Sequence, residues 1–347
     1  MKIDSLVKAL TRLFYVTNTQ NKVLMEKGKF RLRKNELRSS NGKAMVQVLF
    51  PNKDLGVDCV VEAGPFYKLV TNLKGEEITL ELDKNILTVL SGTTKAEFSC
   101  ELDSVFLDKL DFSVPEWNSI PADFIKGLKL CRSSVSADQT RRPLTEIFID
   151  GDKMVATDGC RISQYRLQTK MFDKPIIFPI DLIECILADK DAIDGWCIIE
   201  DIVYVKMGDD CIIGSLTYSP DDYPGIDEYF SKAEEKIDNI FVFPKKVQEV
   251  SARHVLMQKD LFILDRDIKL VWKDKTLGVY SQDEDRYKLV DKIKLEKAIS
   301  DNEISLNIQP EFLSDILKIT GEMKFSLETG CVEFETENFK HLVRLRE

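Results

Sequence analysis

The sequence predicts an α+β fold made of three copies of one small domain. Amphipathic helices recur at a long period, in two series that begin near residues 4, 121 and 244 and at Pro65, Pro179 and Pro310. Short segments that alternate apolar and polar residues follow the helices, which is typical of antiparallel sheets. The period is too long for a solenoid unit. We therefore expect three domains, at residues 1–114, 115–231 and 232–347, each with two helices packed on antiparallel sheets.

Basic residues lie on the polar side of five of these six helices, although the net charge of the chain is −10. The helix that begins at Pro179 is the exception, because its polar residues are Asp181, Glu184 and Asp189. Lysine on a solvated helix face is one explanation. A surface shared by five helices that meets phosphates without reading bases is the other, and we favour it. The candidate DNA-binding residues are Lys8, Arg12, Lys68, Lys74, Lys126, Lys129, Lys246, Arg253 and Lys318.

The segment 142–162 predicts a hairpin that ends in a second tight turn. Thr145–Asp150 is the first expected strand, Gly151-Asp152 the turn and Lys153–Thr157 the return strand. Asp158-Gly159 then breaks the pairing. This pattern fits an ordinary hairpin, and it also fits an exposed loop that forms one wall of a docking cleft.

The composition is that of a soluble globular protein, with 44% apolar and 31% charged residues. No apolar run approaches the roughly 20 residues that span a bilayer, and the first segment is expected to be a helix rather than a signal peptide. Eight cysteines without a CxxC pair are typical of reduced, mostly buried thiols in the cytoplasm. Two histidines leave little for a zinc site or a histidine-based triad.

Catalytic signatures are absent from the sequence: it has no P-loop, GxSxG or HExxH motif. Acidic residues in turns leave one enzymatic alternative, a Mg²⁺-dependent nuclease. Its candidate ligands are Asp158, Asp209, Asp210, Asp221 and Asp222. No metal or cofactor is expected otherwise, and Cys160 has no histidine near it in sequence.

Four segments resemble the bacterial-type DNA polymerase sliding clamp, the beta subunit of DNA polymerase III. RPLTEIFIDGDKMVATDGCRI, with VATDGCRI at Val155–Ile162, is similar to the family's Arg-Pro-x-Leu strand and V-A-T-D-G-H-R-L. Ser219–Phe230 resembles its F-P-D-Y segment, Asn307–Lys318 its F-N-x-x-Y-L-x-x-A-L helix, and Arg344-Leu345 the end of its M-P-M-R-L tail. The resemblance is specific in the second repeat, moderate in the third and architectural in the first.

The resemblance implies a DNA clamp fold and a non-catalytic role. Two chains would close head to tail into a ring, with helices lining the hole and sheets outside. Duplex DNA would pass through the hole, and DNA polymerase and a clamp loader would be the partners. The ring would work in the bacterial cytoplasm, or in the host cytoplasm if the chain is encoded by a phage or mobile element.

The resemblance also implies a peptide-binding cleft between the second and third domains. Its walls would be Leu144, Thr157, Gly159, Cys160, Arg161, Ile162, His341, Leu342, Val343, Arg344 and Leu345. Cys160 replaces the family's histidine, and His341, Leu342 and Val343 replace Met-Pro-Met. Because methionines make adaptable surfaces, these departures suggest a narrower or different set of partners than the host-type clamp has. A ring that tethers transcription or repair proteins shares every one of these features.

Overall fold

The computed structural model describes residues 1–17, 28–50, 54–189, 193–234, 239–262, 265–283, 286–298, 302–326, 328 and 330–346. These residues form two compact units, one of residues 1–128 and 171–220 and the other of residues 129–170 and 221–347. The α-helices are α1 (Ile3–Thr17), α2 (Ala63–Asn72), α3 (Phe124–Arg132), α4 (Ile180–Ala188), α5 (Asp227–Glu234), α6 (Lys246–Met257) and α7 (Pro310–Ile316). Helices and antiparallel sheets occur in both units, so the predicted α+β class is confirmed.

The first unit contains a seven-stranded antiparallel sheet in the order β12-β13-β14-β3-β2-β1-β4. A three-stranded sheet, β5-β6-β7, lies in the same unit. The strands of this unit are β1 (Lys29–Arg33), β2 (Glu36–Ser40), β3 (Ala44–Leu49), β4 (Asp58–Glu62), β5 (Thr79–Asp83), β6 (Ile86–Ser91), β7 (Thr94–Ser99), β11 (Ile176–Phe178), β12 (Ile193–Ile199), β13 (Ile202–Met207) and β14 (Cys211–Leu216). The pairing of β14 with β3 joins strands that are far apart in the chain, with Cys211 opposite Val48.

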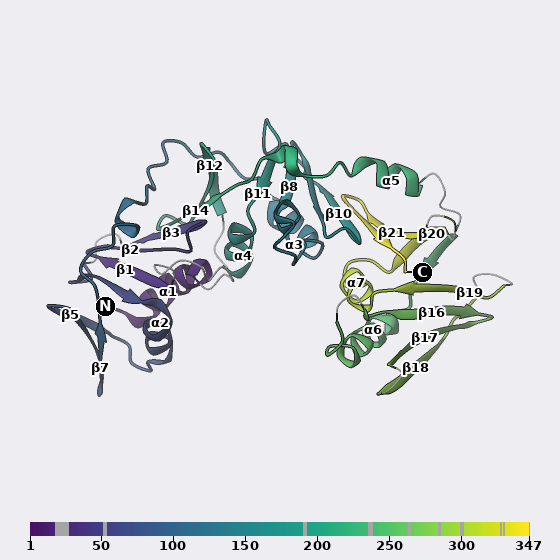
Figure 1. Ribbon diagram of the computed structural model, residues 1–347, viewed down its shortest axis with the longest axis horizontal. Helices are drawn as coiled ribbons and strands as arrows, with labels where there is room; N and C mark the ends of the chain where they lie inside the picture. The colour runs from purple at the N-terminus through teal and green to yellow at the C-terminus, as the bar shows by residue number, and fades with distance from the viewer. Residues whose placement is uncertain are drawn as a thin grey trace. The chain divides into compact units, whose positions relative to one another are not determined.

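Helix α1 provides the main apolar face of this unit. Leu6, Leu10 and Leu13 lie at helical spacing and are fully buried. The helix packs on β2 and β3 and beside α2 (Figure 1). Burying side chains of this size stabilises the unit by about 1.5–3 kcal/mol each, so the amphipathic stripe fixes the orientation of α1.

The second unit repeats this plan. Its larger sheet runs β8-β9-β10-β22-β21-β20-β15, and its smaller sheet has four strands in the order β18-β17-β16-β19. The strands are β8 (Ile147–Asp150), β9 (Lys153–Thr157), β10 (Arg161–Arg166), β15 (Asn239–Val242), β16 (Ile268–Lys273), β17 (Thr276–Asp283), β18 (Tyr287–Lys294), β19 (Ile304–Ile308), β20 (Glu322–Ser326), β21 (Cys331–Thr336) and β22 (Phe339–Arg344). Helix α6 packs beside α7 and against β18 (Figure 1).

One sequence prediction of local structure is wrong. The first strand of the hairpin begins at Ile147 rather than Thr145, because Arg142–Thr145 forms a 3₁₀ turn. Pro143 favours the turn, and the Thr145 hydroxyl donates a 2.7 Å hydrogen bond to the Arg142 carbonyl. The predicted hairpin itself is confirmed, since Phe148 pairs with Val155 and Ile149 with Met154.

Candidate nucleic-acid and peptide interfaces

Exposed lysines lie on the helices of the first unit. Helices α1 and α2 pack through a stack of Phe14 on Tyr67, with ring centroids 4.2 Å apart. Lys8 on α1 and Lys68 on α2 are exposed, and Lys74 is exposed just beyond the end of α2. These three cations therefore have the solvent access that a phosphate contact needs.

Helix α3 carries two further exposed lysines, Lys126 and Lys129. They lie three residues apart and thus on neighbouring positions of one helix face. Phe124, Leu128 and Cys131 on the same helix are fully buried. The amphipathic pattern predicted for this segment is therefore confirmed, although the helix begins at Phe124 rather than Pro121.

Arg12 differs from the other candidates, and its predicted place on an exposed basic face is wrong. Its side chain is only 3% exposed. Its Nε donates to a carboxylate oxygen of Asp189 at 2.6 Å, and one of its terminal nitrogens donates to Asp210 at 2.9 Å. Two charge-assisted bonds compensate for the burial of the guanidinium. Arg12 therefore connects α1 to the end of α4 and to the turn between β13 and β14, and it has no surface for DNA.

The acidic residues of α4 have a similar explanation. Asp181 is buried and accepts a hydrogen bond from the Asn41 side-chain amide at 3.1 Å. Lys43 lies 3.4 Å from its other carboxylate oxygen. With Asp189 bound to Arg12, two carboxylates of this segment are internal ion-pair partners. The prediction that Asp181 lies on a solvated polar face is therefore wrong.

The basic candidates of the second unit lie on or next to α6 and α7. Lys246 is exposed at the start of α6. Arg253 is half exposed and donates to Asp291 at 2.6 Å. Lys318 is exposed beyond α7, and its ammonium lies 3.1 Å from Asp315. Asp291 and Asp315 reduce the local positive potential, but Arg253 and Lys318 keep solvent access.

A tight turn organises the predicted peptide-binding residues. The Thr157 hydroxyl donates to the Arg161 carbonyl at 2.7 Å and accepts the Gly159 N–H at 3.0 Å. One oxygen of Asp158 accepts the N–H groups of Cys160 and Arg161 at 2.9 and 3.0 Å. Gly159 has φ +90°, which L side chains rarely adopt. These bonds hold the backbone of Gly159 and Cys160 at the surface, where both residues are exposed.

Arg161 connects this turn to α7. Its Nε donates to Asp158 at 3.1 Å, and a terminal nitrogen lies 3.5 Å from Asp315. Its guanidinium carbon lies 4.1 Å from the centroid of the Phe312 ring, a cation–π contact. Sequence reasoning missed Phe312 and Asp315 as members of this group. Both belong to the segment 307–318, whose resemblance to the family helix was the signal available.

The C-terminal segment pairs with the other side of this turn. Arg161 lies opposite Val343 and Ile162 opposite Leu342 in the antiparallel pair of β10 and β22. The Arg344 N–H donates to the Cys160 carbonyl at 2.9 Å, which extends the ladder to the turn. The predicted peptide-binding residues are thus brought together in one unit.

Burial divides these residues into two groups. Gly159, Cys160 and Arg344 are exposed, while Leu144, Arg161 and Leu345 are half-buried. Thr157, Ile162 and Leu342 are buried at 4–9% exposure. His341 and Val343 are 1% and 0% exposed, so the prediction that their side chains face a cleft is wrong. Both side chains lie on the same face of β22, which is flanked by β10 and β21, and that face is buried.

His341 belongs to a buried polar chain. Its Nδ1 lies 2.8 Å from the Ser163 hydroxyl, which lies 2.7 Å from the Ser134 hydroxyl. Burial, with Arg161 nearby, lowers the pKa of His341 to about 3. The ring is therefore neutral at physiological pH and serves the packing of the sheet.

His254 lies in a serine–histidine–aspartate arrangement. Its Nδ1 is 2.7 Å from the Ser281 hydroxyl and its Nε2 is 3.4 Å from Asp291. Burial lowers the pKa of His254, and Asp291 opposes this shift. The Ser281 side chain is 5% exposed. A buried hydroxyl has no access for a substrate, so we assign these residues to the packing of α6 on its sheet.

The carboxylates proposed for a nuclease are in part occupied by cations. Asp158 binds Arg161, Asp210 binds Arg12, and the Asp209 carboxylate lies 3.3 Å from Lys206. Asp221 and Asp222 lie in a 3₁₀ turn and are exposed. Within the described ranges, no group of three or more His, Cys, Asp or Glu residues is arranged to hold a metal ion. Nor is any helix in those ranges long and apolar enough to cross a membrane.

Solved structures identify the fold. The whole chain superposes on DNA polymerase III beta chain from Streptococcus pneumoniae, with a TM-score of 0.80, 14% identity and 98% of that chain covered. The beta subunit from Thermotoga maritima gives a TM-score of 0.78 at 15% identity, with 100% of this chain and 98% of that one covered. The chain has the sliding-clamp fold. Neither protein-family models nor curated proteins give a match to its sequence.

Some proteins with the sliding-clamp fold were solved with ligands. A Helicobacter pylori beta clamp bound to a DNA ligase peptide matches with a TM-score of 0.74 at 14% identity, covering 100% of this chain and 99% of that chain. At such identities the likeness defines the fold alone. The expected DNA clamp fold is thus confirmed by comparison, while the binding residues stay predictions.

Proposed function

We propose that this chain is a DNA sliding clamp, a non-catalytic processivity factor that encircles duplex DNA and tethers DNA polymerase. The likeness to clamp structures over the full chain carries the proposal. In this account the chain has three domains, 1–114, 115–231 and 232–347. The protein works in the cytoplasm, where a clamp loader opens it, and topological linkage rather than tight binding holds it on DNA.

Strand pairing supports closure of a ring. The pairs β14–β3 and β10–β22 connect the first proposed domain to the second and the second to the third. By position in the repeat, β18 corresponds to β3 and β10, and β7 corresponds to β14 and β22. Both β18 and β7 are edge strands in their sheets. Pairing of β18 in one copy with β7 of a second copy, head to tail, covers these edges and closes a homodimer.

Cross-linking tests this joint. In a Cys160→Ser background, Glu97→Cys on β7 and Lys292→Cys on β18 are expected to give a covalent dimer with a short bismaleimide. The dimer should have twice the chain mass of 39.8 kDa. Glu81→Cys on β5, at the other edge of the same sheet, replaces Glu97→Cys in the matched control. A monomer in solution, or equal cross-linking from β5, contradicts the proposed joint.

The exposed cations of the helices are the proposed contacts to duplex DNA. They are Lys8, Lys68, Lys74, Lys126, Lys129, Lys246, Arg253 and Lys318. Binding through phosphates is independent of sequence and falls steeply with salt. The other acidic surfaces of a chain with net charge −10 repel DNA.

The surface around the Gly159 turn is the proposed site for partner peptides. Leu144, Gly159, Cys160, Arg161, Arg344 and Leu345 keep access to solvent. Thr157, Ile162 and Leu342 are buried and lie opposite one another on adjacent strands beside the turn. We propose that polymerase and clamp-loader peptides bind here, and that Cys160 changes or narrows the range of partners. We also propose that the chain is encoded by a phage or mobile element.

Affinity capture separates this proposal from a ring that serves transcription or repair. Immobilised protein is expected to retain a DNA polymerase and clamp-loader subunits from its own cell extract. Cys160→Trp, which fills the exposed turn, should reduce their capture, while Val105→Trp, at an exposed position of the first unit, should not. Capture of RNA polymerase in place of DNA polymerase favours the alternative function.

A further inference from the structure

The four-stranded sheet of the second unit has one face open to solvent. Along β16, Leu270 and Trp272 are buried, whereas Lys269 and Lys273 are exposed. Helix α6 packs against β18. A hollow of about 790 Å³ lies over the open face, lined by residues of β16, β17, β18 and β19. None of its lining residues is among the candidate DNA-binding or peptide-binding residues described above.

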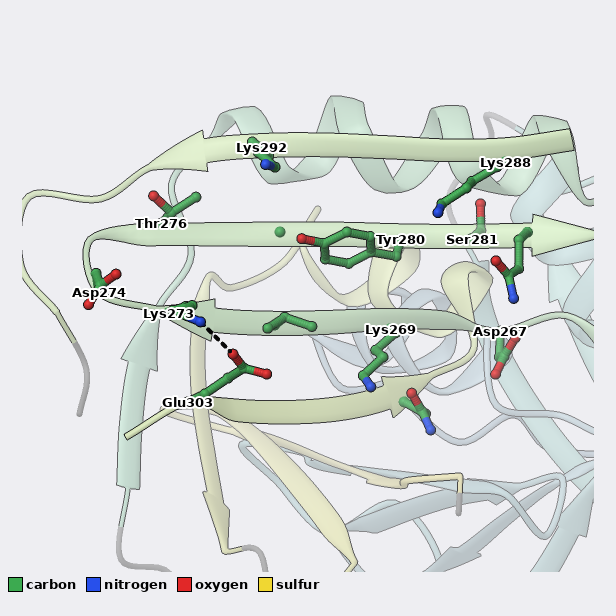
Figure 2. Close-up of a pocket in the computed structure, with 14 residues that line it drawn as sticks. Asp267, Lys269, Lys273, Asp274, Thr276, Tyr280, Ser281, Lys288, Lys292 and Glu303 are labelled. Carbon is green, nitrogen blue, oxygen red and sulfur yellow. Dashed lines mark ion pairs between the residues drawn. The ribbon is translucent and has the colours of Figure 1, made fainter. Parts of the chain in front are cut away.

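An aromatic ring forms the floor of this hollow. Figure 2 shows the Tyr280 ring lying along β17. A Cβ atom at Gly278 would overlap this ring, so the glycine is what allows the tyrosine to lie flat. Val271 lies opposite Gly278 on β16, and Val290 lies opposite Tyr280 on β18. The floor is therefore planar and partly apolar.

Lysines form two rows beside this floor. Lys269 lies opposite Tyr280 on β16, and Lys292 lies opposite Gly278 on β18. Lys288 lies opposite Gln282 on β18. The two rows are separated by two strand spacings, about 10 Å. Within the described residues, no carboxylate forms an ion pair with Lys269, Lys288 or Lys292.

Three carboxylates also line the hollow, but they lie away from its centre. Glu303 is paired with Lys273, with 3.4 Å between the charged atoms. Asp267 and Asp274 lie toward opposite ends of the hollow (Figure 2). The ring of Tyr280 is thus flanked by the three lysines that have no carboxylate partner.

We propose that this sheet face binds single-stranded nucleic acid. A flat aromatic ring between two rows of cations is the arrangement that stacks a base and holds the phosphates beside it. Duplex DNA hides its base faces inside the helix, and an acidic peptide has no aromatic ring beside each of its charges. The occupant is therefore a single strand, whose unpaired bases are free to stack on Tyr280.

Fluorescence anisotropy with a labelled dT oligonucleotide of about 12 nucleotides tests the proposal. The triple variant Lys269→Ala, Lys288→Ala, Lys292→Ala is expected to raise Kd at least about tenfold, and to lower the log–log salt slope by about 2. The matched control removes the same charge from exposed lysines elsewhere, with Lys109→Ala, Lys174→Ala and Lys259→Ala. Tyr280→Phe should bind like the wild type, and Tyr280→Leu should bind about tenfold more weakly. An rU oligonucleotide of the same length distinguishes RNA from DNA as the source of the strand.

Each outcome bears on the proposal. Equal loss in the triple variant and in its control overturns it, as does equal binding by Tyr280→Leu and Tyr280→Phe. Binding of a poly-glutamate peptide with no oligonucleotide binding overturns it in favour of an acidic partner. Retention of the triple variant on circular duplex DNA, measured separately, reports the proposed clamp function. A failure of single-strand binding with intact retention therefore refutes this inference alone.

Discussion

Acidification is expected to destabilise the chain through its buried histidines. The folded chain holds His341 neutral, with a pKa of about 3, whereas an unfolded histidine has a pKa of about 6.5. As the pH falls below about 6.5, the unfolded chain binds a proton that the folded chain does not, so the free energy of unfolding decreases. One group contributes about 1.36 kcal/mol per pH unit, or about 2 kcal/mol at pH 5. His254, whose pKa is also lowered by burial, acts in the same direction.

Urea denaturation of the wild type and of His341→Asn measures this term. The asparagine keeps a polar partner for Ser163 but removes the titrating group. The stability advantage of the wild type over the variant should shrink by about 2 kcal/mol between pH 7 and pH 5, while the carboxylates, common to both proteins, cancel. An unchanged difference between the two pH values refutes the argument. A second check is NMR, in which the His341 ring resonances should not titrate between pH 8 and pH 5.

Three further predictions concern single sites. Arg12→Ala should lower the free energy of unfolding by about 3 kcal/mol, because Asp189 and Asp210 lose their shared partner; Lys8→Ala on the same helix should change it by less than about 0.5 kcal/mol in the same urea titration. Gly159→Ala should cost about 1 kcal/mol, because its φ of +90° strains any L side chain and its Cβ would lie 3.0 Å from the Arg141 guanidinium. Gly64→Ala is the control, since open space surrounds that position, and equal thermal shifts for both would contradict the strain argument. Lys126→Glu with Lys129→Glu should lower the salt concentration at which protein leaves circular DNA, without a change in melting temperature, and unchanged salt resistance would remove α3 from the DNA contact.

The confirmed predictions of helices and strands rest on patterns of apolar and polar residues that are local in the sequence. The stripe Leu6, Leu10 and Leu13 in α1 and the alternation in β8 follow from spacing along the chain, so the helices and the hairpin were predictable. Arg12 lies at a helix position where the sequence pattern predicts an arginine exposed to solvent. Its carboxylate partners lie 177 and 198 residues away, and only the folded chain brings them to it.

The C-terminal segment shows the same limit. Its amino-acid sequence resembles the end of the family's tail. The burial of His341 and Val343, however, depends on the pairing of β22 with β10 and β21. Pairing between strands nearly 180 residues apart cannot be read from a window of sequence. The turn at Gly159 was predictable, because its geometry is fixed by neighbours such as Asp158 and Thr157. The contact of Arg161 with Phe312 was not, because it crosses between elements.

Retention on circular and linear DNA tests the central claim most directly. The protein is loaded by a clamp loader onto a nicked circular duplex at moderate salt, and the circle is then cut once with a restriction enzyme. A ring held by topology stays on the circle and slides off the linear product, so retention should fall on cutting. Equal retention on the circle and on the linear DNA would contradict a sliding clamp.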